Sequence, residues 1–131
     1  MHNGLAKQER LYLKEEINTL FAGKQGFVCY PVRVVYTLVP TSVSTPPVKI
    51  ILSVPKRLHK HAVARNRIKR LYRECYRTNK HSLTDFVQAL GLGTLLVGFV
   101  YLSDEVCSYA QAEKSTRIAL DKLLKRLHDD G

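Results

Sequence analysis

Apolar residues recur at helical spacing near both ends of the chain. A first helix, which Gly23 would end, has an apolar face formed by Leu13, Ile17, Leu20 and Phe21. A last helix has an apolar face as well. Its expected cap is Ser103 or Ser108. The positions on this second face are Thr116, Ala119, Leu120, Leu123, Leu124 and Leu127. Each helix therefore has one side suited to burial.

Apolar runs rich in β-branched residues predict the strands. Residues 32–39 and 48–54 are joined by a loop of Ser, Thr and Pro, so we expect them to pair antiparallel. Residues 94–102 are almost continuously apolar, which predicts a central strand buried on both faces. Residues 26–30 are a candidate for an extra strand.

Between these strands we expect a basic helix over residues 62–78, followed by a loop with helix-like patches that runs to Gly93. The resulting order is α-β-β-(β)-α-β-α, which indicates an α+β sandwich. A chain of 131 residues is of the length of one domain, so we expect residues 1–131 to form a single domain.

Charge is concentrated in the middle of the chain. Residues 49–81 hold eleven Lys and Arg against one acid, Glu74, and this surplus of ten equals the net charge of the whole protein, +10. A surplus confined to one segment predicts a single polyanion-binding surface. With a sequence pI of about 9.7, nucleic acid is the expected partner.

The basic helix has two faces. At 100° per residue, one face gathers Asn66, Lys69, Arg70, Arg73 and Arg77, with Arg65 and Arg67 on its flanks. The opposite face gathers Ala64, Ile68, Leu71, Tyr72 and Cys75. Arginine suits bidentate contact with phosphate, and the Asn66 amide suits a base edge or a 2′-hydroxyl. The helix can therefore lie on a sheet and present a cationic ridge.

The sequence also argues against several classes of protein. The first ten residues lack the apolar region of a signal peptide, and residues 94–102 are about half the length of a membrane span. The three cysteines are far apart, which argues against disulfide or zinc frameworks and favours the cytoplasm. No paired carboxylates, HExxH or Gly-rich phosphate loop is present, so we assign no catalytic residue and no protein-bound metal.

Three other interpretations of the basic helix stay open at this point. A charge run is often only a solvated face, although such faces normally mix signs. A ribosomal or assembly protein would also bind RNA without any enzymatic role. A helix-turn-helix DNA reader would need different flanking elements and base contacts near the amino end of its recognition helix.

The segment Arg65-Asn66-Arg67-Ile68-Lys69-Arg70-Leu71 closely resembles the RNR signature of the bacterial ribonuclease P protein subunit. Ser53-Val54-Pro55-Lys56-Arg57 and Ala62-Val63 resemble the segments that flank it, and the similarity spans about residues 10–127. The chain departs from the family at Pro55 and at His59-Lys60-His61, where members usually have a small residue and then a glycine.

The resemblance implies a fold like the second domain of ribosomal protein S5, with a left-handed β-α-β crossover made by the basic helix. It also implies a partner, ribonuclease P RNA, bound one to one. Because the apolar surfaces of the sequence are all needed for the core, we expect the free protein to be a monomer. The holoenzyme is an endoribonuclease that removes the 5′ leader of precursor tRNA, using Mg²⁺ held mainly by the RNA subunit and the substrate. The protein is then an accessory to catalysis by RNA.

Two binding surfaces follow from the resemblance. The residues expected to contact the catalytic RNA are Lys56, Arg57, Arg65, Asn66, Arg67, Lys69, Arg70 and Arg73. The leader would lie in a cleft between the first helix and the sheet, on Phe21, Arg33 and Tyr36. Ordinary core packing is the alternative for the two aromatic residues.

Other residues receive no binding role. His59 and His61 are interpreted as neighbours of phosphate or bystanders, Cys75 as a core thiol, and the 108–127 helix as structural.

Overall fold

A computed structural model describes residues 14–23, 25–40, 47–91 and 93–130, and the predicted contribution of Leu13 to the first helix lies outside them. The helices and strands follow one another as α1 (Lys14–Ala22), β1 (Gly26–Cys29), β2 (Val32–Val39), β3 (Val48–Ser53), α2 (Ala62–Asn79), α3 (His81–Leu90), β4 (Thr94–Tyr101) and α4 (Tyr109–Asp130). The α+β class and the extra strand, β1, are confirmed.

The strands form one sheet in the order β1-β2-β4-β3. β4 runs antiparallel to β2 and parallel to β3, and it pairs with both along its length. The prediction that β2 and β3 pair with each other was wrong, because β4 lies between them. β4 has the most continuous apolar sequence, and seven of its eight residues are buried, as expected for a strand with both faces covered.

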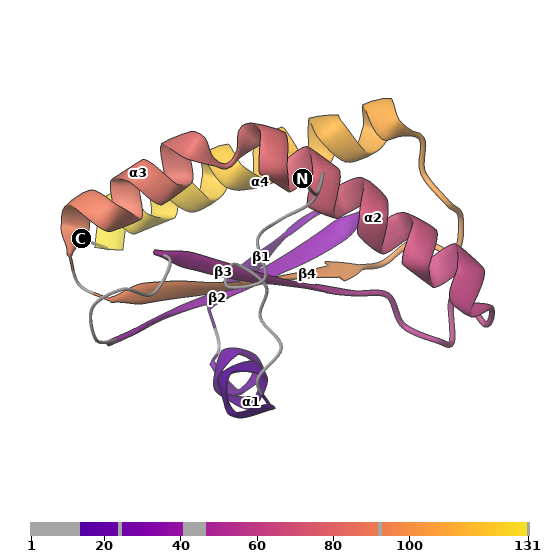
Figure 1. Cartoon of the computed structure of the whole chain (residues 1–131), viewed down its shortest axis with the longest axis horizontal. Coiled ribbons are helices and arrows are strands. Elements are labelled where there is room, and N and C mark those ends of the chain that lie inside the picture. Colours follow the sequence, from indigo (N-terminus) through magenta and orange to yellow (C-terminus); the bar gives the residue numbers. More distant parts are fainter. Residues whose placement is uncertain (1–13, 24, 41–46, 92, 131) are drawn as a thin grey trace, which may run out of the picture.

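Helices cover the two faces of the sheet unequally (Figure 1). α2, α3 and α4 lie on one side and enclose the main core, to which β2 contributes Val32, Val34 and Tyr36. α1 lies alone on the other side, where Leu20 forms a smaller core with Val35 and Leu96. The sheet therefore has one fully covered face and one that α1 covers only in part.

A glycine allows α1 to lie close to the sheet. A Cβ atom at Gly98 would come within 2.9 Å of the Val35 side chain and 3.0 Å of the Leu20 side chain. Both distances are shorter than normal carbon–carbon contacts, so a larger residue would force the Val35 and Leu20 side chains, which pack α1 on the sheet, to move.

The segment after α2 differs from the predicted loop. Residues His81–Leu90 form α3, which buries Leu83 and Val87 and ends at Gly91 in a left-handed conformation with φ of 65°. Leu83 and Val87 are four residues apart, so they share one face of the helix. The polar residues around Leu83 and Val87 obscure this helical spacing in the sequence, so a loop was predicted.

The last helix agrees with its prediction. Ser108 Oγ accepts the Gln111 N–H at 3.2 Å, and the Gln111 side chain accepts the Ser108 N–H at 3.1 Å. This reciprocal pair is a capping box. Ser103 instead accepts the Glu105 N–H, so Ser108 is the cap of the two candidates. Among the described helices, none is both long and apolar enough to cross a membrane.

Candidate nucleic-acid interface

Helix α2 is fixed on the core by one face. Its buried residues are Ile68, Tyr72, Cys75 and Tyr76. The Tyr72 ring lies edge-on to Phe99, with 6.3 Å between centroids and 87° between planes. The Tyr72 hydroxyl lies 2.9 Å from Ser115 Oγ on α4. The predicted apolar face is confirmed for Ile68, Tyr72 and Cys75, and Tyr76 is a member that the prediction missed.

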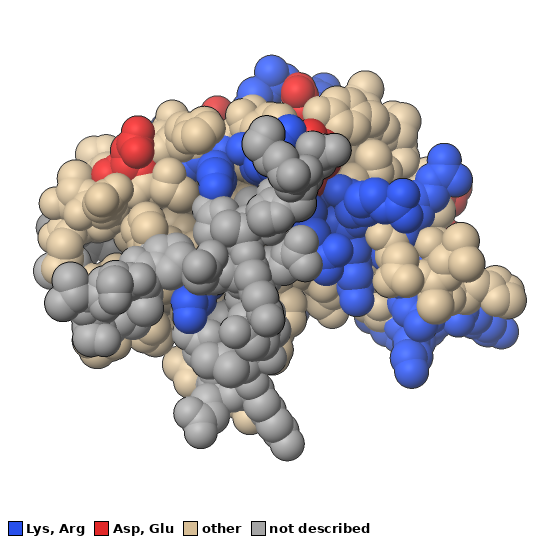
Figure 2. Space-filling view, viewed as in Figure 1, with Lys and Arg blue, Asp and Glu red and all other residues tan. Residues whose placement is uncertain are grey.

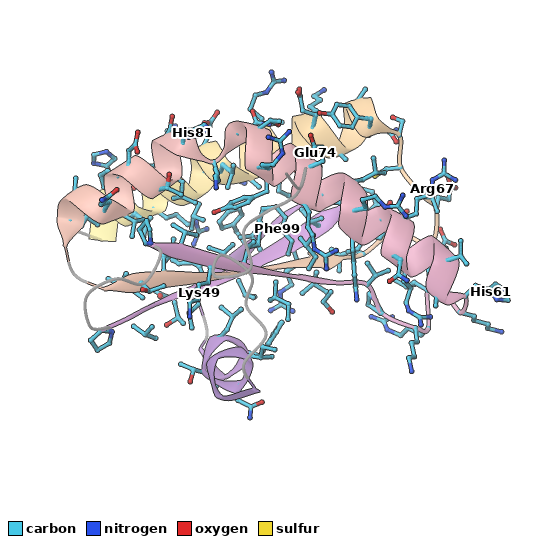
Figure 3. The ribbon with its side chains drawn as sticks, in the orientation of Figure 1. Lys49, His61, Arg67, Glu74, His81 and Phe99 are labelled. Atoms are coloured by element: carbon cyan, nitrogen blue, oxygen red, sulfur yellow. The ribbon has the colours of Figure 1, made fainter. Side chains whose placement is uncertain are left out.

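The opposite face of α2 presents the polar part of the RNR segment. Asn66, Arg67 and Arg70 are exposed, while Lys69 and Arg73 are half-buried. Figure 2 shows Lys and Arg side chains gathered where α2 begins, with few acids among them. In Figure 3, Arg67 lies on α2 away from the sheet, whereas Phe99 lies between the sheet and the helices. A cationic surface is thus held in one orientation.

Arg65 has partners within the chain. Its Nη1 donates to the carbonyl oxygens of His59 at 2.9 Å and Lys60 at 2.8 Å, both just before α2. Its other guanidinium N–H groups leave room for a phosphate contact, since arginine has five donors. The residue predicted to flank the ridge therefore also binds the backbone that precedes it.

Near the carboxyl end of α2 the cationic ridge is neutralised. Arg77 donates to both Glu74 carboxylate oxygens, from Nη2 at 2.5 Å and from Nε at 3.1 Å. The hydrogen bond from Arg77 holds the pKa of the Glu74 carboxyl below its ordinary value. The single acid in the basic segment is thus matched to Arg77, which leaves the net positive charge nearer the start of the helix.

Lys56 and Arg57 lie in a turn between β3 and α2. The turn is closed by the N–H groups of Leu58 and His59, which donate to the Pro55 carbonyl at 3.1 and 3.2 Å. Both basic side chains are exposed. They extend the cationic surface beyond the helix.

The two histidines before α2 have different surroundings. His59 is buried, with Nε2 2.8 Å from the Ser103 carbonyl oxygen, whereas His61 is exposed. Within the described part of the chain, His, Cys, Asp and Glu residues do not form any group of three or more that could hold a metal ion. The interpretation of His59 as a bystander was wrong, because its ring nitrogen bonds a distant loop.

Three basic residues of α4 contact groups within the protein. Lys122 Nζ lies 5.6 Å and Arg126 Cζ 5.0 Å from the centroid of the Phe27 ring, within the range of cation–π contacts. Arg117 is 3.9 Å from Glu113 one turn earlier. These contacts support the structural interpretation of this helix.

The second predicted surface lies on the sheet face that carries α1. Side chains alternate along β2, so Arg33 shares a face with Val35, which packs against Leu20 of α1. Arg33 is exposed and pairs with Val28, which is 55% exposed. Phe21, on α1, is 46% exposed. An arginine and two exposed apolar residues therefore belong to this partly covered side.

Tyr36 does not belong to that surface, and its assignment to the leader cleft was wrong. It is 3% exposed and lies in the main core, with its ring centroid 6.4 Å from that of Phe27. Tyr36 follows Val35, so its side chain points to the other face of the sheet. Val28 was not part of the prediction, and its pairing with Arg33 places it on the same face of the sheet.

Comparisons with known proteins identify the family of this chain. The family model for Ribonuclease P matches residues 5–127. The Ribonuclease P protein component of Porphyromonas gingivalis is 41% identical over 120 residues, which cover 92% of this chain and 86% of that protein. The protein component of Chlorobium phaeobacteroides is 35% identical over 83 residues, or 62% of this chain.

Solved structures show the same fold at low sequence identity. A mutant of the Staphylococcus aureus RNase P protein has a TM-score of 0.66 at 17% identity, with 89% of each chain covered. The RNase P protein of Thermotoga maritima has a TM-score of 0.60 at 20% identity, with 90% of this chain and 96% of that one covered. The family match extends over most of the sequence, and the chain belongs to the ribonuclease P protein family.

Proposed function

We propose that this chain is the protein subunit of ribonuclease P, which joins the catalytic RNA and promotes removal of the 5′ leader from precursor tRNA. The observation that carries the proposal is the exposed RNR face of α2, with Asn66, Arg67 and Arg70 outward and Ile68 and Tyr72 buried beneath. A rigid cationic helix face suits the phosphates of a folded RNA.

The residues proposed to contact the catalytic RNA share the surface from the β3–α2 turn to the middle of α2. They are Lys56, Arg57, Asn66, Arg67, Lys69, Arg70 and Arg73, with Arg65 contributing where its bonds to the backbone allow. This surface would repel Mg²⁺, so we propose that the RNA and the substrate hold the metal ions. The protein then supplies binding and positioning, and the chemistry of phosphodiester hydrolysis stays with the RNA.

The leader of the precursor would lie on the side of the sheet that carries α1. Phe21 offers an aromatic ring for a base, and Arg33 offers a guanidinium for a phosphate. Stacking contributes about 1–3 kcal/mol per base without sequence preference, which suits a subunit that handles many precursors. The free protein is expected to be a monomer that pairs one to one with the RNA in the cytoplasm.

The experiment that tests this function is cleavage of a precursor tRNA at low Mg²⁺. The ribonuclease P RNA of the same organism is assayed alone, the protein alone, and the two together. We expect efficient removal of the leader only when both are present. Tight binding to ribosomal RNA without any stimulation of cleavage would instead support a ribosomal or assembly role.

A further inference from the structure

The segment between β3 and α2 is attached to a loop that is distant in sequence. The buried His59 ring, 7% exposed, places Nε2 2.8 Å from the Ser103 carbonyl oxygen, across 44 residues of sequence. A carbonyl oxygen can only accept, so Nε2 carries the proton and donates. The ring also lies against Tyr101, with 5.8 Å between centroids.

Tyr101 holds the loop to which His59 binds. Its hydroxyl donates to the Glu105 carbonyl at 2.6 Å and accepts the Cys107 N–H at 3.1 Å. The β4–α4 loop is therefore fixed by the end of β4. A side chain that bonds this loop is attached to the core of the domain.

From the other direction, Arg65 attaches the helix to the same segment. Arg65 Nη1 donates hydrogen bonds to the carbonyl oxygens of His59 and Lys60. These bonds join α2 to the two residues before His61. The path from α2 to the core thus runs from Arg65 to the His59 backbone, and from the His59 ring to Ser103. Each step is a hydrogen bond of ordinary length.

The start of α2 needs such an attachment. His61, at the N-cap, makes no side-chain capping bond, and the first turn contains no acid. The positive end of the helix dipole disfavours Arg65 and Arg67, which lie close to it. Since neither capping nor local charge stabilises this end, contacts with the rest of the fold must do so.

We propose that His59 is a positioning residue that, through Ser103 and Arg65, fixes the first turns of α2 and so orients Asn66 and Arg67 toward the catalytic RNA. This inference rests on the proposed function for its RNA partner, but the attachment itself belongs to the free protein. The two parts are tested separately.

The first test is amide hydrogen exchange of the free protein. His59→Phe keeps a ring against Tyr101 and removes the bond to Ser103, and His59→Gln restores a donor at a similar reach. We expect exchange over residues 64–68 to rise by about tenfold in His59→Phe and to return toward wild type in His59→Gln. His61→Phe, the same change at an exposed position, should leave these amides unchanged.

The second test is affinity for the catalytic RNA as a function of salt. His59→Phe should weaken binding several-fold and leave the slope of log K against log salt unchanged, because the ring that it replaces contacts the protein. Arg67→Ala should reduce the steepness of that slope by about one. Unchanged exchange over residues 64–68, or an equal rise across α2 and β4, would overturn the inference. If the wild-type protein does not bind the RNA, the proposed function fails while the exchange result still stands.

Discussion

Two arginines on α2 carry the same charge in different surroundings. Arg67 is exposed on the RNR face, whereas Arg77 makes a bidentate pair with Glu74 three residues before it. A phosphate that approaches Arg77 must compete with a carboxylate already bound there. The environment of each residue therefore decides whether it can take part in binding RNA.

We expect Arg67→Ala to weaken binding of the catalytic RNA by about tenfold, because a charge-assisted contact is lost. Arg77→Ala combined with Glu74→Gln is the control and should have a clearly smaller effect, since it removes an ion pair with no net charge. Filter binding at fixed salt measures both. An equal loss in the two variants would show that only net charge matters.

The cysteine thiols allow a prediction of how the rate of chemical labelling depends on pH. Burial raises the pKa of the Cys29 thiol above its ordinary value, against an opposing effect of Lys122. Burial also raises the pKa of Cys75 to about 11. Cys29 lines a hollow of about 440 Å³ beside Tyr30 and Cys107, so a small reagent can reach it, but Cys75 is fully buried.

A raised pKa means less thiolate at a given pH, and the thiolate is the species that reacts. We expect iodoacetamide to label Cys29 in the folded protein, with a rate that is still rising above pH 9. Cys75 should be labelled only after unfolding. Mass spectrometry of peptides after labelling at several pH values measures both, and rapid labelling of native Cys75 would contradict its position in the core.

At the scale of elements, α1 and α2 lie on opposite sides of the sheet and can be perturbed independently. α2 depends on Tyr72 and its neighbours in the main core, whereas α1 depends on Leu20 against Val35 and Leu96. A change under α1 should therefore affect the surface assigned to the leader and leave the RNR face intact.

Gly98→Ala makes this separation testable. The added Cβ would meet Leu20 and Val35, so we expect a loss of about 1–3 kcal/mol in the free energy of unfolding and a displaced α1. Affinity for the catalytic RNA should remain. The holoenzyme's preference for precursor over mature tRNA should fall, and measured affinities for the two substrates provide the readout. A loss confined to the catalytic RNA would contradict the assignment of surfaces.

At the scale of the whole molecule, charge and shape act together. The surplus of ten positive charges lies within residues 49–81, and α2 presents part of it on one exposed face (Figure 2). If about five phosphates are neutralised, log K for assembly with the RNA should fall against log salt with a slope near −3 to −5. Titrations from low to high KCl measure this slope. A slope near zero would exclude a phosphate interface.

The sequence predicted the strands and the two faces of α2 well, because each depends on a local pattern that burial reinforces. It failed where the outcome depends on distant residues. Competition among the strands for partners decides that β4 lies between β2 and β3. Tyr36 is buried because the larger helices cover the side of the sheet to which its side chain points. The bond from His59 to Ser103 joins residues 44 apart, and no local pattern reveals it.

The central place of β4 also has a consequence for the time at which the protein becomes functional during translation. Among the described strands, β3 has β4 as its partner, and β2 has β1 and β4. A nascent chain that ends before Thr94 lacks β4, which pairs with β3, and α4, against which α2 packs. The basic segment is therefore synthesised before the elements that hold it, and the RNR surface can be fixed in its final orientation only after α4 has been made.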